Sequence, residues 1–268
     1  MNDSVLKRLK ETTFFILDMD GTFYLGDELI RGAPEFLDFI KKRGAGYLFL
    51  TNNSSKSPAD YARKFRRIGY PVPEENIFTS GEATARFIEM NTSFRRIFLA
   101  GTPSLEAVFR NAGFELATED PDCCVLGFDT TLTYEKLRVF CDLVRRGMPY
   151  IATHPDLVCP VGGGAFIPDA GAMIAFIKAA AGREPDEVIG KPNKAIMEML
   201  FDQRGIDAGS AALIGDRLYT DIAAAKNAGI LSILPLTGET EREDIEKSQV
   251  KPDIVVRNLL ELKSLMLD

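Results

Sequence analysis

Two carboxylates near the start of the chain stand where they could act on phosphate. Asp18 and Asp20 follow the apolar run 14–17, within the sequence Asp-Met-Asp-Gly-Thr. An aspartate can attack phosphorus and form an aspartyl-phosphate, which divides a difficult hydrolysis into two displacements. A second carboxylate nearby can give and take the protons that these steps require. The pair predicts phosphoryl transfer through a covalent intermediate.

Three further polar groups suit the binding of a phosphoryl group. Thr51 and Asn52 follow the apolar run 47–50, and Lys191 follows the run 188–189. A hydroxyl group and backbone N–H groups at helix starts can hold phosphate oxygens. Lysine supplies a compact positive charge, which offsets crowded carboxylates and the transferring group.

The carboxylates of the last third of the chain suit a metal ion. Asp216 and Asp221 follow the apolar run 211–214. Mg²⁺ takes carboxylate oxygens and keeps several of its waters, so Asp18 together with Asp216 would suit it. Either of the two later aspartates, considered alone, could instead be a helix N-cap.

Short apolar runs alternate with helical patterns along the chain, which is typical of a parallel sheet with crossover helices. In an open parallel sheet the carboxyl ends of the strands share one edge, where ligands bind. We therefore expect the polar groups that follow the runs to meet at one edge. The runs that precede them are 14–17, 47–50, 188–189 and 211–214.

The middle third of the chain has its own alternation of runs and helices, and the last third returns to the first pattern. This order favours a doubly wound α/β core interrupted by an inserted, smaller α/β domain. We expect residues 1–82 and 184–268 to form the core and residues 83–183 to form the insertion. The glycines at 162–164 predict a loop within the insertion.

Composition narrows the partners and the compartment. The net charge is −7, and no dense basic run is present, so we expect no nucleic-acid partner. No apolar run is long enough to cross a bilayer, and the first residues lack the apolar region of a signal peptide. The four cysteines form no C-x-x-C pair. These features favour a cytoplasmic protein with structural thiols.

The chain contains one histidine, His154, and this excludes several mechanisms. A zinc site with two histidines cannot form within one chain, which excludes the H-E-x-x-H hydrolases. A Ser-His-Asp triad would depend on His154, and no G-x-S-x-G segment accompanies it. If the protein is an enzyme, carboxylates, lysine, hydroxyl groups and a metal must do the chemistry.

Four short segments carry the residues singled out above. They read Asp-Met-Asp-Gly-Thr at 18–22, Leu-Thr-Asn-Asn at 50–53, Gly-Lys-Pro at 190–192 and Gly-Asp-Arg-Leu-Tyr-Thr-Asp at 215–221. In this order they resemble the four motifs of the haloacid dehalogenase (HAD) superfamily. The Thr-Asn-Asn form and the spacing are similar to its NagD-like, p-nitrophenylphosphatase-like branch. That resemblance implies that the inserted domain is an α/β cap.

The resemblance implies roles for the four aspartates. Asp18 would be the nucleophile and a Mg²⁺ ligand. Asp20 would protonate the leaving oxygen and later activate water, while its backbone carbonyl touches the metal. Asp216 would complete the metal site, and Asp221 would position the site from behind or through water.

The resemblance also implies roles for groups that face the substrate. Thr51 and Asn52 would bind the phosphoryl group, and Lys191 would pair with it and with the nucleophile. The segment Thr-His-Pro-Asp, which contains His154 and Asp156, matches a substrate-specificity loop. Many relatives carry asparagine in place of His154, so a surface or packing role for this histidine stays open beside a substrate contact.

The aspartate at position 20 favours a phosphatase over the dehalogenases and ion pumps of the superfamily, which lack an acid–base aspartate there.

Two alternatives stay open: a phosphotransferase or mutase using the same aspartyl-phosphate, and a non-catalytic ligand-binding protein on this fold. The substrate is predicted only as a small phosphorylated metabolite, such as a nucleotide, sugar, glycolate, glycerol or pyridoxal phosphate. The resemblance further implies that two copies could pair through the cap.

Overall fold

The computed structural model describes residues 3–161 and 165–267, which divide into two units. The first unit comprises Met1–Leu50, Ala62–Phe78 and Leu200–Asp268, and the second comprises Thr51–Tyr61 and Thr79–Met199. The expected cap, 83–183, lies within the second unit, which also holds 51–61 and 184–199. The boundary between core and cap stays a prediction. The glycine loop predicted at 162–164 lies outside the described residues.

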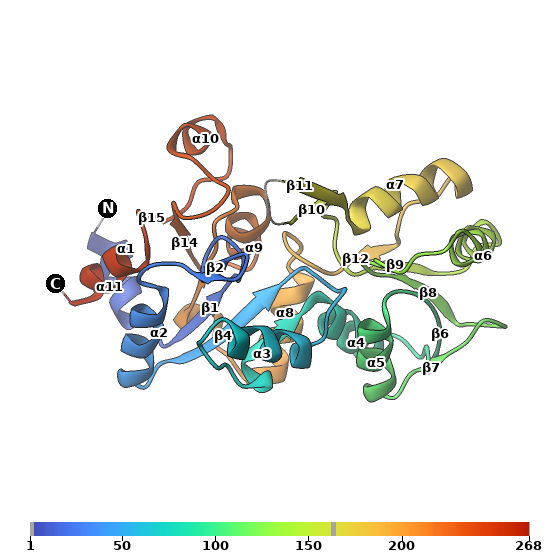
Figure 1. The fold of residues 1–268 in the computed structure, drawn as a ribbon, viewed down its shortest axis with the longest axis horizontal. Helices are drawn as coiled ribbons and strands as arrows, with labels where there is room; N and C mark the ends of the chain where they lie inside the picture. Colours follow the sequence, from blue (N-terminus) through green and yellow to red (C-terminus); the bar gives the residue numbers. More distant parts are fainter. Residues whose placement is uncertain (1–2, 162–164, 268) are drawn as a thin grey trace. The chain divides into compact units, whose positions relative to one another are not determined.

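The first unit is built on a six-stranded sheet, drawn with its helices in Figure 1. Its order is β15 (Ile254–Val256), β14 (Leu231–Pro235), β13 (Ala211–Ile214), β1 (Phe14–Leu17), β4 (Gly46–Thr51) and β5 (Ile77–Thr79). Strand β1 pairs in parallel with both of its neighbours, β13 and β4. The register sets Leu17 opposite Ile214, so these two strands end at the same level.

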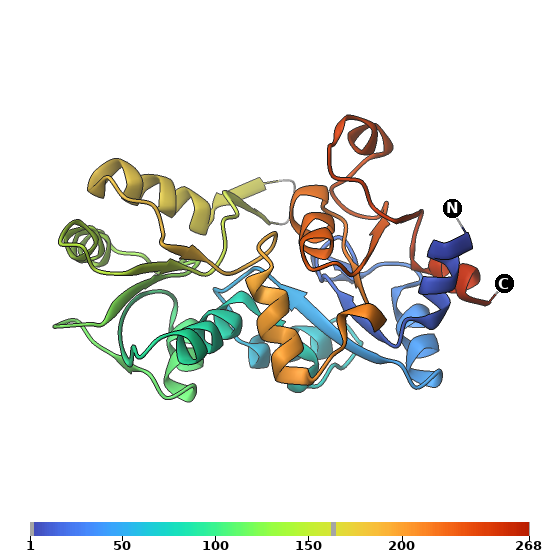
Figure 2. The same ribbon diagram turned by 180° about the vertical axis from the view of Figure 1, so that it is seen from behind.

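The helices of the first unit begin and end near the residues that predict their limits. Helix α2 (Ala33–Lys42) has proline in its first turn, and α3 runs over Pro58–Arg67. Helices α1 (Asp3–Glu11) and α11 (Leu259–Leu267) contact each other, so the two ends of the chain lie side by side (Figures 1 and 2). The remaining elements are β2 (Tyr24–Leu25), β3 (Glu28–Leu29), η1 (Glu74–Asn76), η3 (Ala208–Ser210), η4 (Leu218–Ile222), α9 (Ala223–Asn227) and α10 (Arg242–Lys247).

The second unit contains a five-stranded sheet of its own. Its order is β12 (Glu187–Val188), β9 (Tyr150–Ala152), β8 (Cys123–Leu126), β6 (Arg96–Ala100) and β7 (Glu115–Leu116), and every pair is parallel. The two parallel sheets with their helices confirm the predicted α/β fold class.

One strand does not join the sheet to which the sequence assigned it. The sequence predicts that the run 188–189 ends in the same sheet as the strand before Asp18, but Val188 pairs with Ala152 of β9 in the five-stranded sheet. That part of the prediction is wrong. A strand of two residues carries too little pattern to select between two parallel sheets of similar composition.

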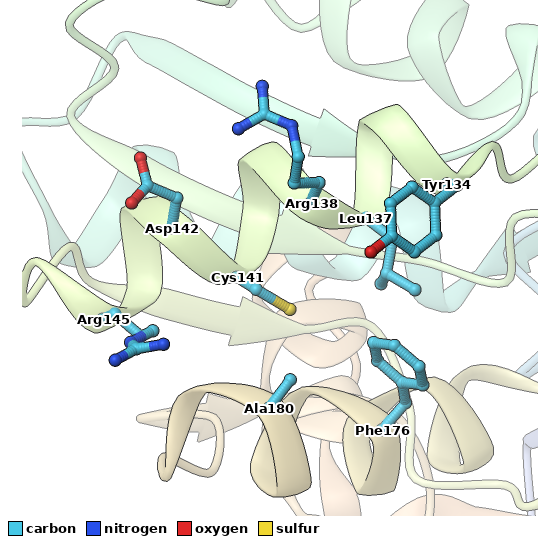
Figure 3. A pocket seen from close by; sticks show the side chains of 8 residues that line it. All are labelled: Tyr134, Leu137, Arg138, Cys141, Asp142, Arg145, Phe176 and Ala180. Carbon is cyan, nitrogen blue, oxygen red and sulfur yellow. The ribbon is translucent and has the colours of Figure 1, made fainter.

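The second unit packs helices α6 (Tyr134–Arg145) and α7 (Ala170–Ala181) together over a core that includes Phe140, Tyr150 and Ile177. A pocket of about 320 Å³ lies between these two helices, beside Tyr134 and Phe176 (Figure 3). None of the predicted site residues lines it. The unit also holds α4 (Ser80–Asn91), α5 (Pro103–Asn111) and the hairpin of β10 (Val158–Val161) with β11 (Ala165–Pro168). Helix α8 (Ala195–Arg204) begins in this unit and ends in the first, because the division falls between Met199 and Leu200.

Two further features concern the cysteines and the lengths of the helices. Cys123, Cys124 and Cys141 are buried, and Cys159 is partly exposed. Among the described residues, no helix is long and apolar enough to cross a membrane.

An aromatic cluster anchors the residue that follows the first motif, Phe23, in the core of the first unit. Phe23 is fully buried, and its ring centroid lies 4.8 Å from that of Phe49 and 5.8 Å from that of Phe65. Both contacts are edge-to-face, the geometry that aromatic rings favour. The backbone N–H of Phe23 donates to the carbonyl of Met19 at 2.8 Å, which ties the loop after β1 to this cluster.

Truncation of this ring is expected to be costly. Phe23→Ala would remove the buried ring and leave a cavity, so we expect the free energy of unfolding to fall by about 3–5 kcal/mol. Urea unfolding followed by circular dichroism measures this change. The nearby Leu25→Ala is the control, because the side chain of Leu25 is 59% exposed and its loss should change stability by less than about 0.5 kcal/mol. Equal effects of the two changes would contradict the packing argument.

Candidate active site

Three carboxylates meet where two neighbouring strands of the first unit end. Asp18 follows β1, and its backbone N–H donates to the carbonyl of Ile214, the last residue of β13, at 2.8 Å. Asp216 comes two residues after that strand. One carboxylate oxygen from each of Asp18, Asp216 and Asp221 can be chosen so that all three lie within 4.8 Å of one another. The structure thus brings together three of the four predicted aspartates.

The loops around Asp216 hold its carboxylate in one place. The hydroxyl of Thr22 donates to Oδ1 at 3.4 Å, and the backbone N–H of Glu239 donates to Oδ2 at 2.7 Å. Gly21 has a φ of +81°, and a Cβ atom built on it would lie 2.5 Å from Oδ2 of Asp216. A Cβ atom on Gly238 would also overlap that oxygen. Both glycines are therefore required for their lack of a side chain.

Asp221 is held by the turn that precedes it. Its Oδ2 accepts a hydrogen bond of 3.2 Å from the backbone N–H of Arg217, at the start of η4. Gly215 provides the space for this carboxyl group, because a Cβ atom at position 215 would collide with the carboxyl carbon of Asp221. The side chain of Asp221 thus acts as a cap for its own turn and also belongs to the carboxylate cluster.

The three carboxylates bring negative charges close together in a largely buried site. Burial, with the neighbouring charge of Asp221, raises the pKa of Asp216 to about 6, although the Glu239 N–H and Arg217 oppose the shift. A divalent cation relieves such crowding, and Mg²⁺ prefers the oxygen ligands that these residues supply. The donor set of the three carboxylates therefore fits the predicted metal.

Arg217 is a charged neighbour to which the sequence analysis gave no role. Its Nε lies 2.9 Å from Oε2 of Glu239. Burial alone would lower the pKa of Arg217, but the charges of Asp18 and Glu239 outweigh it and raise the pKa. The guanidinium therefore stays charged and offsets part of the negative charge of the cluster.

Asp20 lies in a more open place than the three clustered carboxylates. Its side chain is 52% exposed, and its Oδ2 lies 4.0 Å from the Nζ of Lys64. The same Nζ lies 3.7 Å from the centre of the ring of Tyr24. The predicted role of Asp20 uses only its backbone carbonyl for the metal, which leaves the carboxylate available to exchange protons.

In the second unit, Asn52 and Lys191 are joined by a pair of hydrogen bonds, called the clasp below. The backbone N–H of Lys191 donates to Oδ1 of Asn52 at 2.8 Å, and Nδ2 of Asn52 donates to the carbonyl of Lys191 at 2.9 Å. Lys191 is 2% exposed. A Cβ atom on Gly190 would lie 2.7 Å from Oδ1 of Asn52, so the glycine of the third motif permits the clasp.

Thr51 and Ser80 shape the loop that carries Asn52. The hydroxyl of Thr51 accepts from the backbone N–H of Asn53 at 3.2 Å, and the hydroxyl of Ser80 donates to the carbonyl of Asn52. Thr51 is only 9% exposed and Ser80 is fully buried. The sequence analysis missed Ser80, because a serine at the first turn of a helix carries no distinguishing pattern.

The two residues of the predicted specificity loop lie in the second unit, His154 buried and Asp156 partly exposed. Both carboxylate oxygens of Asp156 accept from Nδ2 of Asn52 at 3.2 Å. Burial alone would raise the pKa of Asp156, but His154, Asn52 and Lys191 outweigh it and lower the pKa. His154 is fully buried, which excludes the surface position that the sequence left open. The predicted residues of this unit that lie together are Asn52, His154, Asp156 and Lys191.

Known proteins match the chain over nearly its whole length. The family model of haloacid dehalogenase-like hydrolases matches residues 15–115, and a HAD-hydrolase-like model matches residues 188–262. The 5'-nucleotidase YutF of Bacillus subtilis is 35% identical, with 92% of this chain and 96% of that protein aligned. An acid sugar phosphatase of Staphylococcus haemolyticus is 32% identical, with 94% and 95% aligned.

Solved structures give the same picture. A 4-nitrophenylphosphatase of Thermotoga maritima is 49% identical and superposes with a TM-score of 0.93, with 97% of this chain and 99% of that chain aligned. A glycerol phosphate phosphatase of Mycobacterium tuberculosis is 28% identical, with a TM-score of 0.88 and 95% and 77% aligned. The latter was determined in complex with magnesium, and in another structure with calcium.

Proposed function

Because this chain belongs to the haloacid dehalogenase-like hydrolases, we propose that it hydrolyses small phosphate monoesters with Mg²⁺, through an aspartyl-phosphate on Asp18. Family membership and the phosphatase class, both predicted from the sequence, are confirmed by the comparisons. The Mg²⁺ dependence and the aspartyl-phosphate are supported by the cluster of Asp18, Asp216 and Asp221, whose carboxylate oxygens suit a divalent cation.

The metal would be held by the carboxylates of Asp18 and Asp216 and by the backbone carbonyl of Asp20. Asp221 would support this set from behind or through a water molecule. When bound, Mg²⁺ would offset the charge of the carboxylates and of the phosphoryl oxygens. Thr22 and Glu239 keep Asp216 in position for this role, through the hydrogen bonds that its two oxygens accept.

The covalent steps use the first two aspartates. The carboxylate of Asp18 attacks phosphorus, and the bond between phosphorus and the ester oxygen breaks. Asp20 donates a proton to that leaving oxygen, so the alcohol departs neutral. Asp20 then takes a proton from a water molecule, which attacks the aspartyl-phosphate and releases inorganic phosphate and the Asp18 carboxylate.

Groups of the second and third motifs would hold the phosphoryl oxygens. We assign this role to Thr51, Asn52 and Lys191, on the strength of the motifs that they match. Lys191 suits it chemically, because an ammonium group withdrawn from water interacts strongly with a transferring phosphoryl group. The clasp with Asn52 fixes the backbone from which this side chain extends.

The substrate class follows from relatives whose names differ. They are named for 5'-nucleotides, acid sugar phosphates, glycerol phosphate and 4-nitrophenyl phosphate, which share only a phosphate monoester. We propose that residues 83–183 form the cap, which selects among such esters, and that residues 1–82 and 184–268 form the core. His154 and Asp156 are the proposed specificity residues of the cap. Pairing of two copies through the cap stays a prediction.

Metal removal tests the proposal directly. We expect the protein to release 4-nitrophenol and inorganic phosphate from 4-nitrophenyl phosphate in equal amounts, and to stop when EDTA removes the cation. Excess Mg²⁺ should restore the rate, because the clustered carboxylates regain their counter-charge. Release of nitrophenol without phosphate, when a sugar is added as acceptor, would identify a phosphotransferase instead. Full activity in EDTA would contradict the metal site.

A further inference from the structure

The only imidazole of the chain lies between two carboxylates in the second unit. His154 is fully buried, and its Nδ1 lies 3.6 Å from Oδ2 of Asp156, while its Nε2 lies 3.4 Å from Oδ1 of Asp169. Among the described residues, neither nitrogen makes a hydrogen bond of ordinary length. Two buried nitrogens that each face an acceptor match imidazolium, because the neutral ring has only one N–H donor.

The charges around the ring favour the protonated form. Burial alone would lower the pKa of His154, and so would the nearby Lys191. The facing carboxylate of Asp156 and the negative charge of Asp169 act in the other direction and leave the pKa raised. The ring therefore keeps its proton to a higher pH than a free imidazole does, and loses it as the pH rises.

The imidazole joins two parts of the second unit. On one side, Asp169 accepts from the backbone N–H of Ala170 at 2.6 Å and caps helix α7. The N–H of Gly171, in the same first turn, donates to the carbonyl of Asp156 at 2.7 Å. A Cβ atom on Gly171 would collide with the carbonyl of Pro155, so the loop and the helix are in close contact.

On the other side, the imidazole reaches the proposed phosphate-binding groups. Asp156 accepts from Nδ2 of Asn52 with both oxygens, and the same Nδ2 donates to the carbonyl of Lys191. Asn52 and Lys191 are 5% and 2% exposed, so water cannot easily replace these bonds. The chain of contacts runs from His154 to Asp156, then to Asn52, then to Lys191.

We propose that His154 is a positioning residue for the phosphatase reaction: as imidazolium it holds Asp156 against Asn52, which keeps the backbone of Lys191 in place. Loss of the proton removes the positive charge that faces the Asp156 carboxylate from the imidazole side, and so loosens the clasp. The reaction should therefore slow as the pH rises through the midpoint of the ring. This inference rests on the proposed function.

Because the chain has a single histidine, the charge of His154 can be read without any assay of activity. In tag-free protein, the Cε1–H resonance of this ring reports one titration. We expect a midpoint above the ordinary histidine value of 6.5. The backbone amide resonance of Lys191 should move with the same midpoint. Asp156→Asn and Asp169→Asn should each lower the midpoint, whereas the exposed Asp27→Asn should leave it unchanged.

The kinetic test compares wild-type protein with His154→Asn over the pH range in which the resonance titrates. The wild-type kcat should fall with the midpoint seen for the ring, and the variant should lack this alkaline limb. At pH values where the wild-type ring is charged, kcat of the variant should be lower by about 10-fold or more, as for other residues that orient a catalytic group.

Several results would overturn the inference. A midpoint below the ordinary value, a Lys191 amide that ignores the titration, or an alkaline limb retained by His154→Asn would each do so. A resonance displaced by EDTA would show that a cation, not a proton, occupies the ring. Absence of phosphate release from every ester, with the coupled titration intact, would contradict the proposed function but leave the charged ring and its link to Lys191 standing.

Discussion

Replacing Asp18 by asparagine is expected to abolish phosphate release, with kcat falling at least about 10⁴-fold. The amide cannot attack phosphorus, and it removes one of the three clustered carboxylate donors. Steady-state hydrolysis of 4-nitrophenyl phosphate measures the loss. Wild-type protein quenched in acid during turnover should carry phosphate on the peptide that contains Asp18, and the variant should carry none.

The control for this change is Asp27→Asn, which makes the same carboxylate-to-amide replacement in the same unit. Asp27 forms a surface ion pair of 2.8 Å with Arg67, and its side chain is 66% exposed. Such pairs contribute little to stability, so we expect its kcat to equal that of the wild type. Turnover retained by Asp18→Asn would rule out this nucleophile, whatever the state of the metal site.

Gly238→Ala is expected to weaken Mg²⁺ activation and kcat by about 10–100-fold, the range seen when groups that orient a metal ligand are changed. The added Cβ would overlap Oδ2 of Asp216, the oxygen that also accepts from the Glu239 N–H. The carboxylate must turn away, so the proposed metal loses one ligand. Titration of activity with Mg²⁺ separates a weaker affinity from a lower maximal rate.

The matched control for Gly238→Ala is Gly44→Ala. Gly44 has a φ of +74°, and a Cβ atom there would meet nothing within 4 Å. Its replacement should cost about 1–2 kcal/mol of stability through backbone strain, and should leave the Mg²⁺ dependence unchanged. If Gly238→Ala kept the wild-type Mg²⁺ titration, the overlap with Asp216 would have no functional weight.

Much of the secondary structure could be predicted because residues with fixed conformational roles mark its limits. Proline opens α2 and α3, and a glycine with positive φ, Gly44 or Gly69, follows each helix. These are local effects of a fixed or freed φ angle, so they can be read without knowledge of the fold. The apolar runs predicted β1, β4 and β13 for a similar reason, since buried parallel strands are apolar on both faces.

The partner of a short strand could not be predicted in the same way. β12 has two residues, and what assigns it to the five-stranded sheet is its pairing with Ile151 and Ala152, more than thirty positions earlier. The burial of His154 also depends on a distant part of the chain, because its neighbour Asp169 is the N-cap residue of helix α7, fifteen positions later. Contacts of this kind depend on the fold and leave no local pattern.

The metal cluster was predictable in part. Asp18 and Asp216 follow strands that are neighbours in the sheet, so the rule on carboxyl ends brings them together. The same rule points to the loop after β14, where Gly238 and Glu239 lie, but these residues act through a missing side chain and a backbone N–H. Side-chain chemistry, on which the sequence analysis relied, gives no sign of either.

The burial of Phe23 has a consequence for how the enzyme can fail. Only four residues separate this ring from Asp18, and its amide is bonded to Met19 within the same loop. Regions with few buried contacts open locally at low free energy, whereas regions tied to the core open only with the whole unit. The loop that holds the proposed nucleophile, Asp18, is of the second kind. On mild heating, the molecules that remain folded should therefore keep their full kcat. Total activity should fall in proportion to the fraction of molecules that unfold.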